Sequence, residues 1–350
     1  MAAVTIYDVA ARSGVSIKSV SRVLNGEPNV SAALREKVAK AVEALGYRRS
    51  LSARSLAGAS SSLIAALVDA ELTIEHWRSG RGNDYLSRLE LGVLMECRQA
   101  DYHLMVELVD HSSDTLEREL SALLASIRPD GVLLTPPNSD HPRVLDALDR
   151  AGVNYARIGA EQQLSRGVCV IMDERQAAFD ITAHLIALGH RRIGLVTGPD
   201  PYSASRLRRA GYEKAMTAHG LALDEAAVVE GDFTFPSGVR GIEILMEQVP
   251  AITAVFASND DMALGVLQGA AAAGMSVPRD LSVVGFDDTP SALFSTPTLT
   301  TIRQPVAEMA AEAARGLMTR LRSDEAEVRG AITIPYQLIA RQSSGPVRTD

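Results

Sequence analysis

The sequence predicts a small all-α head followed by a larger α/β body built on parallel sheets. Three short helical patterns, separated by glycine and polar breaks, occupy roughly the first 47 residues. From Leu63 onward, short apolar runs alternate with amphipathic stretches. Residues 1–58 carry a net charge of +5 and leave −13 for the remainder of a chain whose total is −8. A basic head on an acidic body indicates that the head meets a polyanion and the body does not.

Length and composition restrict the protein classes. The chain has 350 residues, too many for one compact core and enough for two or three. No apolar run reaches about 18 residues, and the first residues show no charged leader before an apolar segment, so we expect neither a membrane span nor a signal peptide. Cys97 and Cys169 lie far apart, and we expect no disulfide, metal site or cofactor. A reducing cytoplasm fits this cysteine usage.

The first two helices follow from their capping residues. The segment Thr5-Ile6-Tyr7-Asp8 has the form of a capping box and predicts a helix that begins at Ile6. Gly14 can adopt the left-handed backbone that ends this helix sharply. Ser16 is the expected cap of a second helix, which runs to about Leu24.

A third helix completes the head. The residues Asn25-Gly26-Glu27-Pro28 break the helical pattern, and Ser31 is the next candidate cap. Gly46 ends the helix. Its inward stripe consists of Leu34, Val38, Val42 and Leu45. Two short helices joined by a tight glycine turn and braced by a third form a helix-turn-helix unit.

The second helix of such a unit enters the major groove of DNA with its N-terminal residues leading. Its expected base-facing residues are Ile17, Lys18, Ser21 and Arg22. Lys18 and Arg22 can donate to guanine, and Ile17 can touch a thymine methyl group. The alternative is that Lys18 and Arg22 belong to an ordinary solvated helix face. Residues better suited to phosphate contacts are Tyr7, Ser16, Asn29 and Ser31.

The body is predicted to alternate strands and helices in parallel βαβ units. The candidate strands are Leu63–Val68, His103–Leu108, Gly131–Thr135, Asn154–Ile158, Ile193–Thr197, Ala254–Ala257 and Val283–Phe286. The candidate helices are Leu86–Ala100, Leu116–Ser126, Ala177–Leu188, Leu207–His219 and Met262–Ala273.

Polar and aromatic residues gather where these strands end. Such residues include Asp69, Thr135, Phe233, Asn259 and Asp287. Ligands of open α/β sheets bind beyond the carboxyl ends of the strands, so this rim predicts a small-molecule cleft.

The segment TIYDVAARSGVSIKSVSRVLNGEPNVSAALREKVAKAVEALGY resembles the head of the lactose-repressor (LacI/GalR) family, and the similarity extends through nearly the whole chain. The resemblance implies a periplasmic-binding-protein-like body of two parallel-sheet lobes, with chain crossings near 159–172, 287–302 and 330–336. The expected domains are 1–47 for the head, 48–60 for a hinge helix and 61–345 for the ligand-binding and dimerisation body. Within the body, the N-lobe would cover about 61–160 and 303–332, and the C-lobe about 172–290 and 333–345.

The hinge is similar to the family pattern Y-x-P-N-x-x-A-R-x-L-A, and it departs from that pattern at Arg49 and Ser50. By this resemblance, Leu56 would wedge into the minor groove at the operator centre, so that Leu56→Ala would weaken operator binding but not ligand binding. A plain flexible linker is the alternative. The complete set of expected DNA-binding residues is Thr5, Tyr7, Ser16, Ile17, Lys18, Ser21, Arg22, Asn25, Asn29, Ser31, Arg54 and Leu56.

The family pattern also implies roles at the cleft. The segments SASRLRRAGY, GDFTFPSG, SNDDMALG and VVGFDDTP match family segments that carry a ligand arginine, a stacking aromatic, an asparagine and an acid. Structural alternatives stay open: Arg208 as a surface ion pair, Phe233 as core, and Asn259 as a helix cap. Asp288 is read as an inter-lobe contact, and Glu71 as a further first-lobe candidate. The expected ligand-binding residues are Asp69, Tyr85, Thr135, Arg208, Phe233, Asn259 and Asp287.

The resemblance implies a repressor that binds double-stranded operator DNA as a homodimer. A sugar or glycoside effector would release it, and a co-repressor resembling a nucleobase is the alternative. An enzyme is disfavoured because the sequence has no G-x-G-x-x-G, G-x-x-x-x-G-K-[ST], H-E-x-x-H or G-x-S-x-G motif. A transport binding protein would need an export signal and no DNA-binding head. The last ten residues carry no apolar heptad, so we expect a dimer and not a tetramer.

Overall fold

A computed structural model describes residues 4–24, 27–47, 61–79, 84–322 and 330–348. The chain divides into two compact units, Met1–Ser62 and Leu63–Asp350, which are described separately. The expectations for Asn25 and for the hinge over 48–60, which includes Arg54 and Leu56, fall outside the described residues.

The head is a three-helix unit. Its helices are α1 (Ile6–Ser13), α2 (Ile17–Leu24) and α3 (Ala32–Leu45), which begin and end where their capping residues predict. Gly14 and Gly46 both follow a helix with left-handed backbone (φ of 68° and 60°), a conformation that glycine adopts at no steric cost. The buried core is formed by Val9, Ala10, Val20, Val38 and Ala41, contributed by all three helices.

The first lobe of the body is built on a six-stranded sheet with the order β11-β5-β4-β3-β1-β2, and every strand pair in it is parallel. The strands are β1 (Leu63–Asp69), β2 (His103–Val109), β3 (Gly131–Leu134), β4 (Asn154–Ile158), β5 (Val168–Ile171) and β11 (Ala331–Thr333). The helices are α5 (Ala70–Ser79), α6 (Asp84–Gln99), α7 (Leu116–Ile127), α8 (Pro142–Ala151) and α14 (Val306–Arg322).

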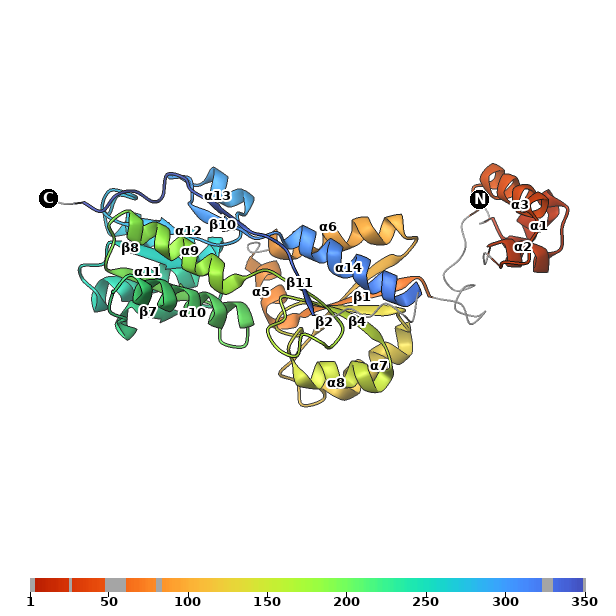
Figure 1. Ribbon diagram of the computed structural model, residues 1–350, viewed down its shortest axis with the longest axis horizontal. Helices are drawn as coiled ribbons and strands as arrows, with labels where there is room; N and C mark the ends of the chain where they lie inside the picture. The colour runs from red at the N-terminus through yellow and green to blue at the C-terminus, as the bar shows by residue number, and fades with distance from the viewer. Residues whose placement is uncertain (1–3, 25–26, 48–60, 80–83, 323–329, 349–350) are drawn as a thin grey trace. The chain divides into compact units, whose positions relative to one another are not determined.

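Both faces of this sheet are covered by helices (Figure 1). Alternate residues of β1 supply two cores: Ile64 and Ala66 pack with α6 and α14, whereas Ala65 and Leu67 pack with α7 and α8. Because successive side chains of a strand point to opposite faces, a strand buried on both sides reads as an unbroken apolar run. This is why the sequence shows runs here and no apolar–polar alternation.

The second lobe holds a parallel four-stranded sheet with the order β7-β6-β8-β9 and an antiparallel pair, β10-β12. Its strands are β6 (Ile193–Thr197), β7 (Val228–Glu230), β8 (Ala254–Ala257), β9 (Ser282–Val284), β10 (Thr301–Arg303) and β12 (Gln337–Ile339). Its helical elements are α9 (Glu174–Ala187), α10 (Ser203–Ala218), η1 (Glu225–Ala227), α11 (Phe235–Gln248), α12 (Asp260–Ala272) and α13 (Pro290–Phe294).

The chain crosses between the lobes three times; the first crossing falls at the end of its predicted range, the second lies outside its range, and the third lies within its range. The segment predicted as the first crossing (159–172) contains β5, which pairs with β4 in the first sheet, so the crossing follows Ile171. The second lies at Gln304–Pro305 and not within 287–302, because β10 still pairs with β12 of the second lobe. The third lies between β11 and β12, at the end of the predicted 330–336.

The lobe boundaries shift accordingly. The first segment of the first lobe ends at Ile171, not near residue 160. The chain returns to this lobe at α14, just after the predicted residue 303. The second lobe extends through β10, well beyond the predicted end at 290. Short strands of three or four residues carry too little pattern to be distinguished from loops in sequence.

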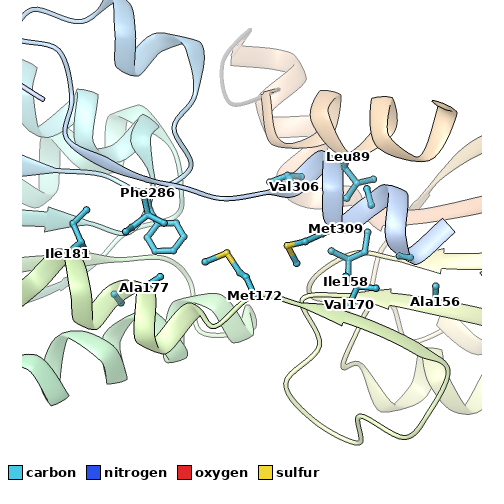
Figure 2. Close-up of a cluster of buried hydrophobic side chains, with 14 of the residues drawn as sticks. Leu89, Ala156, Ile158, Val170, Met172, Ala177, Ile181, Phe286, Val306 and Met309 are labelled. Carbon is cyan, nitrogen blue, oxygen red and sulfur yellow. The ribbon is translucent and has the colours of Figure 1, made fainter. Parts of the chain in front are cut away.

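A single buried cluster extends across the crossings (Figure 2). Met172 lies at the first crossing, between Phe286 of the second lobe and Met309 of the first. The packed core therefore continues from one lobe into the other along the connecting segments.

Two negative findings concern the described residues. None of their helices is long and apolar enough to span a membrane. No group of three or more histidine, cysteine, aspartate or glutamate side chains among them has metal-site geometry.

Cys97 and Cys169 are both buried as free thiols.

Candidate functional site

The candidate DNA-reading surface lies on the exposed side of α2. Val20 is fully buried in the head, whereas Ile17 is 40% exposed and Lys18 is exposed on the opposite side. An exposed isoleucine at a helix start adds nothing to the core, so it is free to meet a partner. Ser21 is half-buried.

Arg22 is engaged within the head. Its Nε donates to Glu27 Oε2 at 2.8 Å, and its Nη2 donates to the backbone oxygen of Asn29 at 3.1 Å. The ion pair is about 40% exposed on each side, so its net strength is small and the guanidinium can be exchanged for a DNA partner. Arg22 was predicted to read bases, with an ordinary solvated side chain as the alternative. In this structure it does neither, because its guanidinium is held by Glu27 and Asn29.

Several residues predicted to contact phosphate are helix caps in the structure. The Asp8 carboxylate accepts hydrogen bonds from the backbone and hydroxyl of Thr5, which lower the pKa of Asp8. Ser16 Oγ accepts from the Ser19 backbone at 3.1 Å, and Ser31 Oγ accepts from Leu34 at 3.3 Å. The remaining two are exposed: Tyr7, with 68% of its surface accessible, and Asn29.

The body contains a cavity of about 130 Å³ between its lobes. All seven residues predicted to bind ligand line it: Asp69, Tyr85, Thr135, Arg208, Phe233, Asn259 and Asp287. They come from the carboxyl ends of strands in both sheets, from the loop before α11, from α6 and α10, and from the cap of α12. Glu71 is exposed and is not among the lining residues.

Asp69 connects the two lobes at one side of the cavity. It is 5% exposed, and its Oδ2 accepts from the backbone of Leu72 at 2.9 Å, which caps the start of α5. Oδ2 also accepts from the Tyr202 hydroxyl of the second lobe at 2.8 Å, and Oδ1 lies 3.0 Å from His111 Nδ1. Burial, followed by the charge of Asp69, raises the pKa of Tyr202, so its hydroxyl stays a donor.

Arg208 is buried, with 4% of its surface exposed. Its Nε donates to Glu174 Oε2 at 2.8 Å, Nη1 to Ser258 O at 2.5 Å and Nη2 to Gln304 Oε1 at 3.4 Å. The guanidinium carbon also lies 3.7 Å above the ring centre of Phe286. The surface ion pair considered as an alternative is therefore wrong: the pair exists, but it lies inside the cavity wall.

Asp287 holds an unusual backbone at the cavity. Its φ is 118°, a left-handed region that costs a residue with a Cβ of order 1–3 kcal/mol, and such strain concentrates at binding sites. Burial raises the pKa of Asp287 well above its usual range, although the charge of Arg208 opposes the rise. The neighbouring Asp288 turns away and binds Arg303 and Arg341.

Asn259 acts as a helix cap while it lines the cavity. Its Oδ1 accepts from the backbone of Met262 at 2.9 Å, and its Nδ2 donates to Phe233 O at 2.9 Å. One amide N–H remains for a ligand. The helix-cap alternative is therefore confirmed, and it is compatible with the predicted ligand contact.

The Phe233 ring lies at the cavity wall against Tyr202, edge to face, with ring centres 5.4 Å apart. Gly198, which follows β6, makes room for that ring, because a Cβ there would lie 2.1 Å from Phe233 Cζ.

Several lining residues were missed by sequence reasoning, among them His76, Glu174 and Tyr202. His76 Nε2 is buried without a hydrogen-bond partner, and burial lowers the pKa of His76. Glu174 resembles an ordinary first-turn acid in sequence, and only the fold reveals Arg208 as its partner. Tyr202 precedes the segment SASRLRRAGY, so proximity to that motif was the available indication.

Comparisons with known proteins find family matches in both the head and the body. Residues 5–50 match the profile "Bacterial regulatory proteins, lacI family", and residues 182–344 match "Periplasmic binding protein-like domain". Catabolite control protein A of Priestia megaterium is 32% identical over 97% of this chain and 99% of its own length. The transcriptional regulator CelR of Thermobifida fusca is 34% identical over 97% of this chain and 98% of its own.

Solved structures agree over nearly the full length. The lac repressor dimer bound to operator and the anti-inducer ONPF is 28% identical with a TM-score of 0.81, covering 98% of this chain and 100% of that one. A complex of CelR with cellobiose is 32% identical with a TM-score of 0.72, covering 97% of this chain and 99% of that one.

Proposed function

The chain belongs to the lacI family of bacterial regulatory proteins, and from this premise we propose that it is a homodimeric repressor released from a pseudo-palindromic operator by a sugar or glycoside. The observation that carries the proposal is one cavity lined from both lobes, in a chain that also carries a helix-turn-helix head. The DNA bound by such a regulator is cytoplasmic, so we place the protein there.

The head supports direct reading of a major groove. Helix α2 presents Ile17 and Lys18 at its exposed N-terminal end, which is the end that leads into the groove. Lys18 suits a guanine and Ile17 a thymine methyl group. The two heads of a dimer would meet two half-sites, and this accounts for the pseudo-palindrome.

The cavity chemistry supports a polyhydroxy effector. Asp287 can accept and Arg208 can donate to neighbouring hydroxyls, and the Phe233 ring offers an apolar surface to one face of a sugar. Two related proteins bind such molecules: CelR was solved with cellobiose, and a family member of Enterococcus faecium with ribose.

Coupling to DNA requires that a ligand favour one arrangement of the lobes. Contacts bridge the lobes around the cavity: Tyr202 to Asp69, and Ser203 Oγ to Gly159 O at 3.1 Å. Arg88 of α6 donates to the backbone oxygens of Asp287 and Asp288. A ligand that binds Asp287 therefore acts on a segment already tied to the first lobe.

An apolar surface on the first lobe supports the dimer. Leu91, Leu94 and Met95 of α6 are each about half exposed, and so is Leu108 of the edge strand β2 against which α6 packs. Exposed apolar patches of this kind mark protein–protein contacts. The related lac repressor was solved as a dimer.

We further propose that the protein catalyses no reaction. His190 is 2% exposed and holds the second lobe together through Thr253, Ser282 and the backbone of Gly345. The adjacent acids Asp287 and Asp288 diverge, so they do not form an opposed pair of the kind glycoside hydrolysis needs.

The test of this function is the variant Asp287→Asn, since asparagine tolerates a positive φ but cannot accept through two oxygens. Operator fragments are first selected from a random duplex library with the wild-type protein. In gel-shift titrations the variant should bind operator like wild type but lose its response to a sugar or glycoside found by thermal-shift screening. A normal dose response would refute the assignment of Asp287. If a nucleobase were the sole active ligand, the effector would be a co-repressor and not a sugar.

A further inference from the structure

The charge on the cavity wall is strongly one-sided. Among the residues that the structure describes, the lining includes one arginine, Arg208. The acidic lining residues are Asp69, Asp84, Glu174, Asp261 and Asp287. The only other group there able to carry positive charge is the buried ring of His76.

The arginine already has its counter-charge. Glu174 and Arg208 are 8% and 5% exposed and form a buried ion pair of 2.8 Å. The partners of Arg208 take three of its five N–H groups, so two remain to donate to a ligand. Arg208 can thus serve as a hydrogen-bond donor, but it offers no unbalanced positive charge to an anion.

Side chains cap two of the helix starts that face the cavity. Helix N-termini bind phosphate through free backbone N–H groups. Here the carboxylate of Asp69 caps α5 through Leu72, and the amide of Asn259 caps α12 through Met262. At each of these two helix starts, a side-chain oxygen already occupies a position that an anionic group would take.

From these observations, and resting on the function proposed above, we infer that the cavity selects an uncharged polyhydroxy effector and rejects its phosphorylated form. A phosphate would enter a site with several carboxylates and no unpaired cation, and burying an unpaired charge is costly. Hydroxyl groups of a neutral ligand can be fully hydrogen-bonded at this site. Carboxylates accept from them, and the remaining N–H groups of Arg208 and Asn259 donate to them. Glu174 is the positioning residue, since it neutralises Arg208 without being required to touch the ligand.

The inference is tested on the full-length protein without DNA. Binding is followed by thermal shift and by the fluorescence of Trp77, the only tryptophan, which lies beside His76 on α5 and is 77% exposed. The probes are inorganic phosphate and three matched pairs: glucose and glucose 6-phosphate, ribose and ribose 5-phosphate, and cellobiose and its 6-phosphate. A neutral sugar should bind at least about a hundredfold more tightly than its phosphate, as expected when a charge is buried unpaired.

Two substitutions of equal charge change sharpen the test. Glu174→Gln leaves Arg208 without its counter-charge, and it should narrow the neutral-to-phosphate ratio by at least about tenfold. Glu225→Gln, at a glutamate whose side chain is 79% exposed and paired with Arg209, should keep the wild-type ratio. If circular dichroism shows that Glu174→Gln does not fold, Asp84→Asn removes a cavity charge at the start of α6 and should narrow the ratio in the same direction.

Three results would overturn the inference: tighter or equal binding of a sugar phosphate, binding of inorganic phosphate, or failure of every probe to bind. The operator titration is scored separately. A sugar phosphate that binds and releases the operator would defeat this inference but leave the proposed function intact. A neutral sugar that binds more tightly than its phosphate but does not change operator binding would leave this inference intact and defeat the proposed function.

Discussion

Lys18 extends from the exposed side of α2 without any ion-pair partner among the described residues, whereas Arg22 on the same helix is tied to Glu27 and Asn29. A free ammonium group can approach a base edge without breaking an existing contact. Lys18 should therefore contribute more to sequence discrimination than Arg22, even though both suit guanine equally in sequence.

The change Lys18→Ala should reduce the preference for the selected operator over a scrambled duplex by about 1–3 kcal/mol, the value of one good base contact. Gel-shift titrations at fixed salt measure it. Lys40→Ala is the matched control, because Lys40 loses the same charge from α3, where it pairs with Glu36 and is 74% exposed. Equal losses in both variants would mean that Lys18 contributes only general attraction to phosphate.

Residues at the ends of strands were the most predictable part of the site. Strand ends are marked in sequence by a change from apolar to polar residues, so Asp69, Thr135 and Asn259 could be located without a structure. Glu174 and Tyr202 could not, because their partners Arg208 and Asp69 lie far away in the chain. Glu174 meets Arg208 only when α9 and α10 pack side by side.

At the scale of elements, α6 combines several roles that its sequence shows only in part. Its first turn brings Tyr85 to the cavity, Arg88 reaches the backbone of Asp287 and Asp288, and Leu94 faces outward. Its amphipathic pattern predicted a helix but not these contacts. The close packing of α6 on α14 depends on Gly92, where a Cβ would lie 2.1 Å from the backbone oxygen of Ala307.

Gly92→Ala should consequently destabilise the body. The clash is with backbone, which cannot move aside as a side chain can, so overpacking should cost about 1–3 kcal/mol despite the better helix propensity of alanine. Urea unfolding of the two variants Gly92→Ala and Gly316→Ala compares the cases, since a Cβ at Gly316 meets a side chain, Val168 Cγ1, at 2.8 Å. A larger loss at Gly316 would contradict the explanation.

The start of α12 contains a buried acid that makes stability depend on pH. Asp260 accepts from the backbone and hydroxyl of Thr289 and from the hydroxyl of Thr301, yet its burial raises its pKa to about 7. The unfolded chain loses this proton near the ordinary pKa of 3.8, whereas the folded chain keeps it to about pH 7. Between these values the folded state binds more protons, so this group's contribution to stability falls as the pH rises.

The variant Asp260→Asn has no titratable group at this position. We therefore expect the difference in unfolding free energy, wild type minus variant, to fall by about 2 kcal/mol between pH 5 and pH 8. Urea titrations at both pH values measure this difference. Asp280→Asn is the control, because hydrogen bonding to Arg279 lowers the pKa of Asp280 to about 2 and it does not titrate in this range. A difference independent of pH for Asp260→Asn would show that the acid is ionised throughout.

At the scale of the whole molecule, the order of helices and strands predicted the head and a parallel α/β body, since long periodic segments are the most reliable pattern in a sequence. The division of that body into two lobes came from the family resemblance. The second crossing was misplaced and the first was drawn too early, because β5 and β10 have only three or four residues each, and β11 is equally short. Their assignment to one sheet or the other depends on pairing partners more than a hundred residues away in the case of β11 and β5.

The apolar surface on α6 and β2 predicts how copies associate. Leu94→Glu should convert a dimer to a monomer in analytical ultracentrifugation, because a charge would be buried unpaired at the interface. Leu223→Glu places the same charge at a leucine of similar exposure, 47% against 51%, on the loop after α10, and it should stay dimeric. A dimer that survives Leu94→Glu would place the interface elsewhere.

The central claim is that occupation of the cavity and binding of DNA are coupled. Coupling between two sites is reciprocal, so an effector that weakens operator binding by some factor must itself bind more weakly by the same factor when operator is present. The decisive measurement is the Kd of one neutral sugar for the full-length protein with and without saturating operator, beside the Kd for operator with and without that sugar. We predict equal shifts of about 5–150-fold in both directions. A sugar that binds in the cavity with the same Kd whether or not operator is bound would contradict the account.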